Sequence, residues 1–64
     1  MNVSPLAATL LRALRDNPSW GGELPSWLGI AVWAHGYTDE KPTRVDVAWA
    51  LEELREASQR RQAA

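Results

Sequence analysis

The chain has 64 residues, 45% of them hydrophobic and 23% charged, with a formal net charge of −1 at neutral pH. This length predicts one small domain near the lower limit for an independent core. Without cysteine there is neither a disulfide nor a thiolate metal site, and the single histidine, His35, cannot hold a structural zinc alone. The slightly acidic balance does not favour a polyanionic partner. We therefore expect no metal and no cofactor, and a second protein surface as the remaining source of stability.

The first predicted helix spans residues 5–16. Ser4 is a residue type that caps helix N-termini, and Pro5 suits the first helical position because its φ is already helical. The leucines that follow recur with a helical period. Pro18 biases Asn17 away from helical backbone, which places the end of the helix near residue 16. The next residues, SWGGE, predict a turn.

The stretch LPSWLGIAVWAHGY, residues 24–37, predicts a second helix over residues 25–35. Its apolar residues surround the helix instead of forming one stripe, and such a helix is normally buried on all sides. Gly36 is the expected capping glycine, with Tyr37 supplying the apolar contact that accompanies such a cap. A buried strand over residues 28–34 is the alternative, because Ile, Val and Trp favour sheets.

The third predicted helix spans residues 44–60, and residues 61–64 are expected to fray. Thr43 is a suitable N-cap, and Asp46, three residues later, resembles the partner residue of a capping box. The apolar residues that follow form a single stripe: Val47, Ala50, Leu51 and Leu54. The sequence therefore predicts an all-α protein, a compact three-helix, helix-turn-helix-like domain over residues 1–64.

The segment TRVDVAWALEELREA resembles the recognition helix of the winged-helix DNA-binding superfamily. In that superfamily the helix often reads Ser/Thr-x-x-x-Val-x-x-Ala-Leu-x-x-Leu, matched here by Thr43, Val47, Ala50, Leu51 and Leu54. LLRALRDNP is similar to the first helix of those domains, so the resemblance covers residues 5–57. It implies a helix-turn-helix core. The chain departs from the family in its apolar second helix and in the absence of a β-hairpin wing from these 64 residues.

The same resemblance implies an alternative function, that of a small DNA-binding transcriptional regulator. Its candidate DNA contacts are Thr43, Arg44 and Trp49. Bases in the major groove are read mainly by Arg, Lys, Asn or Gln, and phosphates are bound by cations. The positions expected to face the groove include only one cation: Thr43, Arg44, Val45, Asp46, Ala48, Trp49 and Glu52. Because carboxylates repel phosphate, we expect nucleic acid to be the less favoured partner.

The chain has four tryptophans. The core of so small a domain is not expected to enclose all of their rings. A buried tryptophan removes roughly 200 Å² from water, and a small domain has a single core. The alternative is that all four pack internally. Trp and Tyr are also enriched among interface hot spots. The candidate protein interface comprises Trp27, Ile30, Trp33, Tyr37 and Trp49, with Trp33 and Trp49 expected to face outward.

The sequence offers little for catalysis, and we expect neither enzymatic activity nor a small-molecule substrate. His35 lies at the end of the second predicted helix, where a cation suits the helix dipole. Glu52 and Glu53 are expected to be solvated, because neighbours on a helix do not face a common point. The predicted function is therefore a non-enzymatic protein-interaction or regulatory module. Its partner is a second copy, giving a homodimer, or a different protein.

The first residues, MNVSPLAAT, lack the basic and long apolar segments of a signal peptide. The apolar run over residues 24–34 is too short to cross a bilayer. We therefore expect no membrane partner and a cytoplasmic location.

Overall fold

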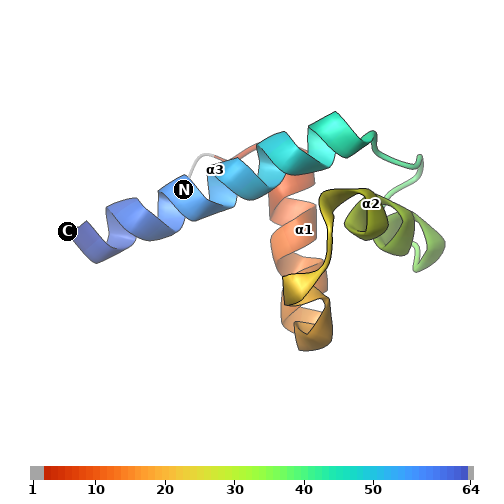
Figure 1. Cartoon of the computed structure of the whole chain (residues 1–64), viewed down its shortest axis with the longest axis horizontal. Helices are drawn as coiled ribbons and strands as arrows, with labels where there is room; N and C mark the ends of the chain where they lie inside the picture. Colours follow the sequence, from red (N-terminus) through yellow and green to blue (C-terminus); the bar gives the residue numbers. More distant parts are fainter. Residues whose placement is uncertain (1–2, 64) are drawn as a thin grey trace.

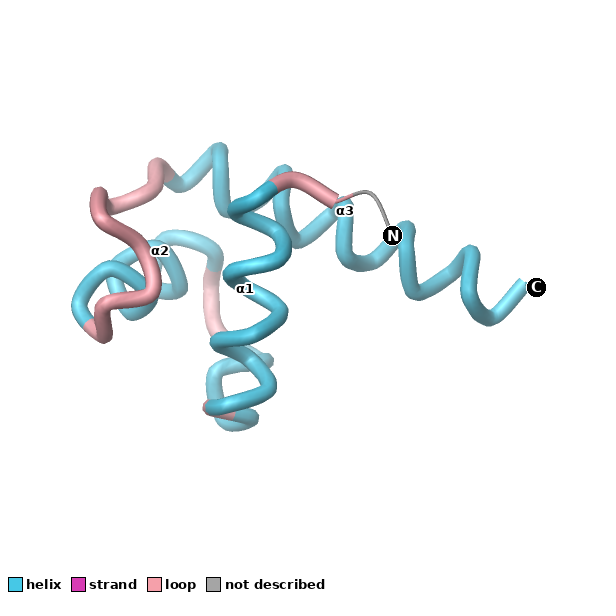
Figure 2. The backbone as a smooth tube through the Cα atoms, turned by 180° about the vertical axis from the view of Figure 1, so that it is seen from behind, coloured by secondary structure: helices cyan, strands magenta, loops and turns pink. Residues whose placement is uncertain are grey.

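Helices make up most of the structure, a computed structural model that describes residues 3–63. They follow one another as α1 (Pro5–Asp16), the 3₁₀ helix η1 (Pro18–Gly22), α2 (Pro25–Ala34) and α3 (Arg44–Ala63). α3 crosses the start of α1 and lies over α2, and its C-terminal part extends beyond the other helices (Figures 1 and 2). No strand occurs in the described part of the chain. The predicted all-α, three-helix class is thus confirmed.

The core lies where the three helices meet. Its buried residues come from every element: Ala7, Leu10 and Ala13 of α1, Trp20 of η1, Leu28, Ala31 and Val32 of α2, and Val47 and Ala50 of α3. Gly29 allows α2 to approach its neighbours closely. A Cβ at this position would lie 3.1 Å from the Pro42 carbonyl oxygen and 3.3 Å from Cγ2 of Val47. The glycine therefore keeps the buried side of α2 in contact with α3 and the loop before it.

The start of α1 is held by its own cap and by α3. The Ser4 hydroxyl accepts a hydrogen bond from the Ala7 N–H at 3.2 Å, as expected of an N-cap. The carboxylate of Glu53 accepts two more, from the Ser4 N–H at 3.1 Å and from the Ser4 hydroxyl at 2.8 Å. Glu53 is half-buried, so the expectation that it is solvated is wrong. Its charge instead meets the positive end of the α1 dipole.

Glu53→Ala is expected to lower the free energy of unfolding by about 1–2 kcal/mol, because hydrogen bonds to a charged acceptor are lost. Urea unfolding followed by circular dichroism measures this change. Glu56→Ala is the matched control on the same helix, since its carboxylate makes only an exposed pair with Arg60 at 3.9 Å. We expect less than about 0.5 kcal/mol for the control. Equal losses in the two variants would contradict the anchoring role of Glu53.

α2 ends in a Schellman motif, so residues 28–34 are helix and the alternative of a strand is wrong. Gly36 has a φ of 83°, and its N–H donates to the Trp33 carbonyl at 3.1 Å. The Tyr37 N–H donates to the Val32 carbonyl at 2.8 Å. Both bonds satisfy carbonyls that the end of the helix leaves free. The helix ends one residue before the predicted end, because His35 is the C-cap.

Gly36→Ala is expected to cost about 1–2 kcal/mol of stability, because a side chain disfavours left-handed backbone. Crowding does not contribute, since no atom lies within 4 Å of a Cβ built at Gly36. Gly22→Ala is the control, because that position has equal space and no positive φ. Urea denaturation of both variants provides the comparison. A Gly36→Ala variant as stable as the control would contradict the strain expected of a side chain at this positive φ.

α3 begins at the predicted cap and continues past its predicted end. The Thr43 hydroxyl accepts a hydrogen bond from the Asp46 N–H at 3.1 Å. The helix extends through Ala63, so residues 61–63 are helical and residue 64 lies outside the described residues. Two ion pairs lie along its exposed side, Glu52–Arg55 at 2.6 Å and Glu56–Arg60 at 3.9 Å. Pairs at these spacings add modestly to the stability of a helix.

Candidate protein-interaction surfaces

The outer face of α2 carries three large apolar side chains that the fold leaves exposed. Trp27, Ile30 and Trp33 are 40%, 50% and 48% exposed, and we call these three residues the α2 patch. The opposite face of the same helix is buried in the core through Leu28 and Val32. A helix that is apolar all round is thus only half covered, because the described chain has packing partners for one side of it. This agrees with the expectation that part of the helix stays exposed.

Charge is absent from α2 itself, since none of its ten residues is Asp, Glu, Lys or Arg. The exposed positions beside the α2 patch are occupied by small residues, Ser26 and Ala34. Leu24, just before the helix, is also largely exposed. Another protein that covers this face would therefore bury apolar side chains without having to desolvate a charge on the helix.

The buried tryptophan of η1 supports the α2 patch from beneath. The ring of Trp20 meets the ring of Trp27 edge-on, with centroids 5.5 Å apart and planes at 83°. It makes similar edge contacts with His35 at 5.0 Å and with Tyr37 at 6.3 Å. Because aromatic pairs prefer this geometry, the contact with Trp20 favours one orientation of the Trp27 ring. The core position of Trp20 is not apparent from the sequence, because residues 19–23 predict only a turn there.

Tyr37 differs from the α2 patch in its burial and hydrogen bonds, although the sequence groups it with the candidate interface. Its side chain is half-buried, and its hydroxyl donates to the Asp16 carboxylate at 3.0 Å and accepts from the Asn17 amide at 3.2 Å. The Arg12 guanidinium lies over the ring, 5.6 Å from its centroid. Tyr37 therefore ties the loop after α2 to the end of α1.

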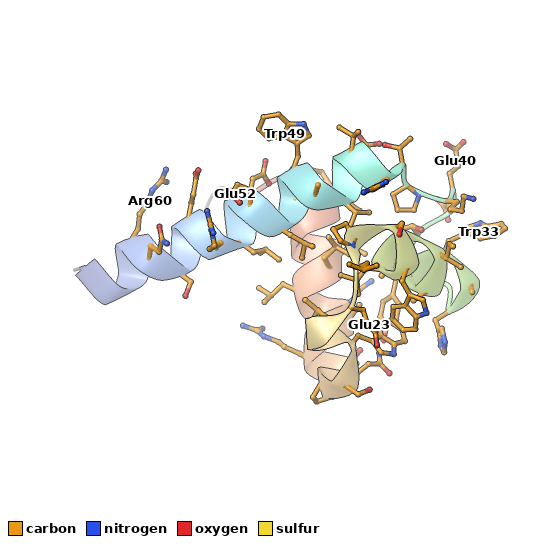
Figure 3. The ribbon with its side chains drawn as sticks, in the orientation of Figure 1. Glu23, Trp33, Glu40, Trp49, Glu52 and Arg60 are labelled. Carbon is orange, nitrogen blue, oxygen red and sulfur yellow. The ribbon has the colours of Figure 1, made fainter. Side chains whose placement is uncertain are left out.

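A second exposed apolar pair lies on α3. Val45 and Trp49, which we call the α3 patch, are 62% and 69% exposed and lie one helical turn apart. Trp49 points away from α1 and α2, whereas Trp33 projects from α2 at a different side of the molecule (Figure 3). The outward placement expected for Trp33 and Trp49 is confirmed, but the structure does not bring the two rings onto one surface.

The candidate DNA contacts lie together around the start of α3. Thr43, Arg44 and Trp49 are all exposed. The Thr43 hydroxyl already accepts the capping hydrogen bond of the helix. Carboxylates flank Trp49 along the helix at Asp46 and Glu52, the latter paired with Arg55 at 2.6 Å. Arg44 is the one cation in the first turn of the helix.

Within residues 3–63, no group of three or more His, Cys, Asp or Glu side chains is arranged to hold a metal ion. None of the helices described combines the length and apolar character needed to cross a membrane. Together with Leu24, the α2 patch and the α3 patch contain the exposed large apolar side chains of the described residues.

Comparisons of the chain with protein-family models, curated proteins and solved structures found no match. The resemblance to the winged-helix superfamily thus stays a prediction from residues 5–57.

Proposed function

We propose that this protein is a non-enzymatic interaction module that binds another protein surface through the α2 patch. The partner is a second copy of the chain or a different target. The observation that carries the proposal is the exposure of Trp27, Ile30 and Trp33 on one uncharged helix face. Exposed apolar groups of this kind mark interaction surfaces in small proteins, and tryptophan is the residue most enriched in their hot spots.

The exposed area supports reversible binding. From their exposed fractions, the three side chains present about 300 Å² in total. Covering this area is worth about 7 kcal/mol at 25 cal/mol per Å². Association itself costs on the order of 4–15 kcal/mol, and the partner's own apolar area contributes to the balance. The α2 patch is therefore suited to reversible binding of a partner and not to a permanent complex.

The test compares two variants that place the same charge on different exposed faces. Trp33→Asp changes the α2 patch, and Val45→Asp changes the α3 patch. The immobilised protein is offered labelled free chain and, separately, a cell lysate. We expect saturable binding of the free chain or of one lysate protein to the wild type and to Val45→Asp, and its loss in Trp33→Asp. Binding that Trp33→Asp leaves unchanged would contradict the proposal.

The second candidate function is that of a DNA-binding regulator acting through the start of α3. It is supported by the joint exposure of Thr43, Arg44 and Trp49 and by the resemblance of this helix to a recognition helix. Two features count against it. Asp46 places a carboxylate in the same turn, and residues 35–43 form a longer connection than the three- or four-residue turn of helix-turn-helix proteins.

Titration with duplex DNA at about 50 and 200 mM salt separates the two functions. The interaction module predicts little binding at either salt concentration. The regulator predicts binding that weakens steeply with salt, is lost in Arg44→Ala and survives in Trp33→Ser. That second pattern would favour the regulator and contradict the leading proposal.

A further inference from the structure

We propose that the α2 patch is covered by a second copy of the same chain, in an antiparallel two-fold dimer centred on Ile30. This inference rests on the proposed function and names its partner. Three properties of the exposed face of α2 carry it: the order of its residues, its charge and its area.

The order of the exposed residues is symmetric about Ile30. Trp27 and Trp33 lie three positions before and after it, and the small residues Ser26 and Ala34 lie four positions before and after it. A two-fold interface uses the same surface from both copies, so this surface must be complementary to itself. An antiparallel pairing of two such helices meets that requirement.

The pairing also places large side chains against small ones. With 3.6 residues per turn and a rise of 1.5 Å per residue, Trp27 of one copy lies beside Ala34 of the second copy. By the same symmetry, Trp33 lies beside Ser26 of the second copy. Each indole then occupies the space that a small residue leaves, which lets the helix axes approach to about 8–10 Å. Ile30 meets its own counterpart on the two-fold axis.

The charge pattern favours self-pairing on α2 over self-pairing on α3. Because α2 has no charged residue, two copies of its exposed face bring no like charges together. The antiparallel arrangement also sets the positive end of each helix dipole beside the negative end of the other. On the α3 patch, Asp46 and Glu52 flank Trp49 on both sides, so a two-fold contact there would bring carboxylates together.

The area sets the strength of the dimer. Together with Leu24, the α2 patch exposes about 450 Å² of apolar side chain per copy. A standard interface buries about 800 Å² per partner, and weak, transient ones bury less than about 600 Å². The exposed face of α2 thus falls in the weak class. We expect a reversible dimer with a dissociation constant on the order of 10–100 µM.

Single cysteines test this arrangement, because the chain has none of its own. In Ile30→Cys the two thiols meet at the two-fold axis, within the roughly 4–7 Å between Cα atoms that a disulfide needs. In Ala34→Cys they are about 12 Å apart along the helices. Val45→Cys is the control on α3, where Val45 is 62% exposed against 50% for Ile30. Under mild oxidation we expect Ile30→Cys to form disulfide-linked dimer at least about tenfold faster than the other two, and Trp33→Asp in the same chain to abolish this advantage.

Each other outcome overturns the inference in a recognisable way. Faster cross-linking of Ala34→Cys than of Ile30→Cys would show that the contact is not centred on Ile30. Comparable rates in these two variants, both faster than Val45→Cys, would indicate parallel helices, and equal rates in all three would indicate random collision. A wild-type chain that shows no self-association but captures a different protein through Trp33 would overturn the dimer and leave the proposed function standing. A chain that binds neither itself nor another protein would overturn both.

Discussion

Trp20→Ala is expected to leave the protein largely unfolded at 25 °C. Trp20 is buried, and its ring is the common neighbour of Trp27, His35 and Tyr37. Replacing a buried tryptophan with alanine typically costs about 3–5 kcal/mol, and a core of this size rarely supplies more than about 3–5 kcal/mol in total. Far-UV circular dichroism during a urea titration measures the loss.

Trp49→Ala is the matched control for this prediction, because the same residue type is removed from a position that is 69% exposed. We expect its free energy of unfolding to stay within about 0.5 kcal/mol of the wild type. A Trp20→Ala variant that unfolds cooperatively with a loss below about 1 kcal/mol would show that Trp20 is not central to the packing. The support that it gives the α2 patch would then be in doubt as well.

Trp33→Asp is expected to weaken self-association by at least about 100-fold while leaving the helices folded. In the proposed dimer both copies lose the exposed half of an indole, about 240 Å² in total. That area corresponds to about 6 kcal/mol as an upper estimate, and each 1.4 kcal/mol is a factor of ten in the dissociation constant. The new carboxylate would also be desolvated beside Ser26 of the second copy. Sedimentation equilibrium gives the dissociation constants.

Val45→Asp is the control, since it adds the same charge to an exposed position outside the α2 patch. We expect it to dimerise like the wild type. Far-UV circular dichroism verifies that Trp33→Asp is still helical. If that variant is unfolded, Ile30→Asp serves as the second test, because Ile30 is 50% exposed and lies at the centre of the proposed contact. Unchanged association in a folded variant of either kind would contradict this use of the α2 patch.

The starts of the three helices and the ends of α1 and α2 could be predicted to within one residue because their signals are local, whereas α3 continues past its predicted end. Ser4 and Pro5 start α1, Thr43 caps α3, and Gly36 ends α2 through bonds that involve only nearby residues. The hydrogen bonds from Ser4 to Glu53 could not be predicted in this way. They join residues 49 positions apart, and only the crossing of α1 and α3 brings these residues together.

For the candidate site, the exposure of apolar residues on α2 was predictable from the sequence, but the grouping of the aromatic residues was not. The apolar composition of α2 indicates that the helix has more apolar surface than its neighbours can cover, and Trp33 is accordingly exposed. The sequence does not reveal which aromatic residues share a surface. Tyr37 is held at the end of α1 by Asp16, and Trp49 lies on a separate side of the molecule. Both placements depend on how the helices pack.

The mass of the wild-type chain in solution, measured by light scattering from about 10 µM to 1 mM, tests the central claim most directly. A weak dimer through α2 predicts that the mass rises with concentration from 7.1 kDa toward twice that value. It also predicts that Trp33→Asp needs at least about 100-fold higher concentrations for the same rise in mass. A wild-type mass of 7.1 kDa at every concentration would contradict the dimer.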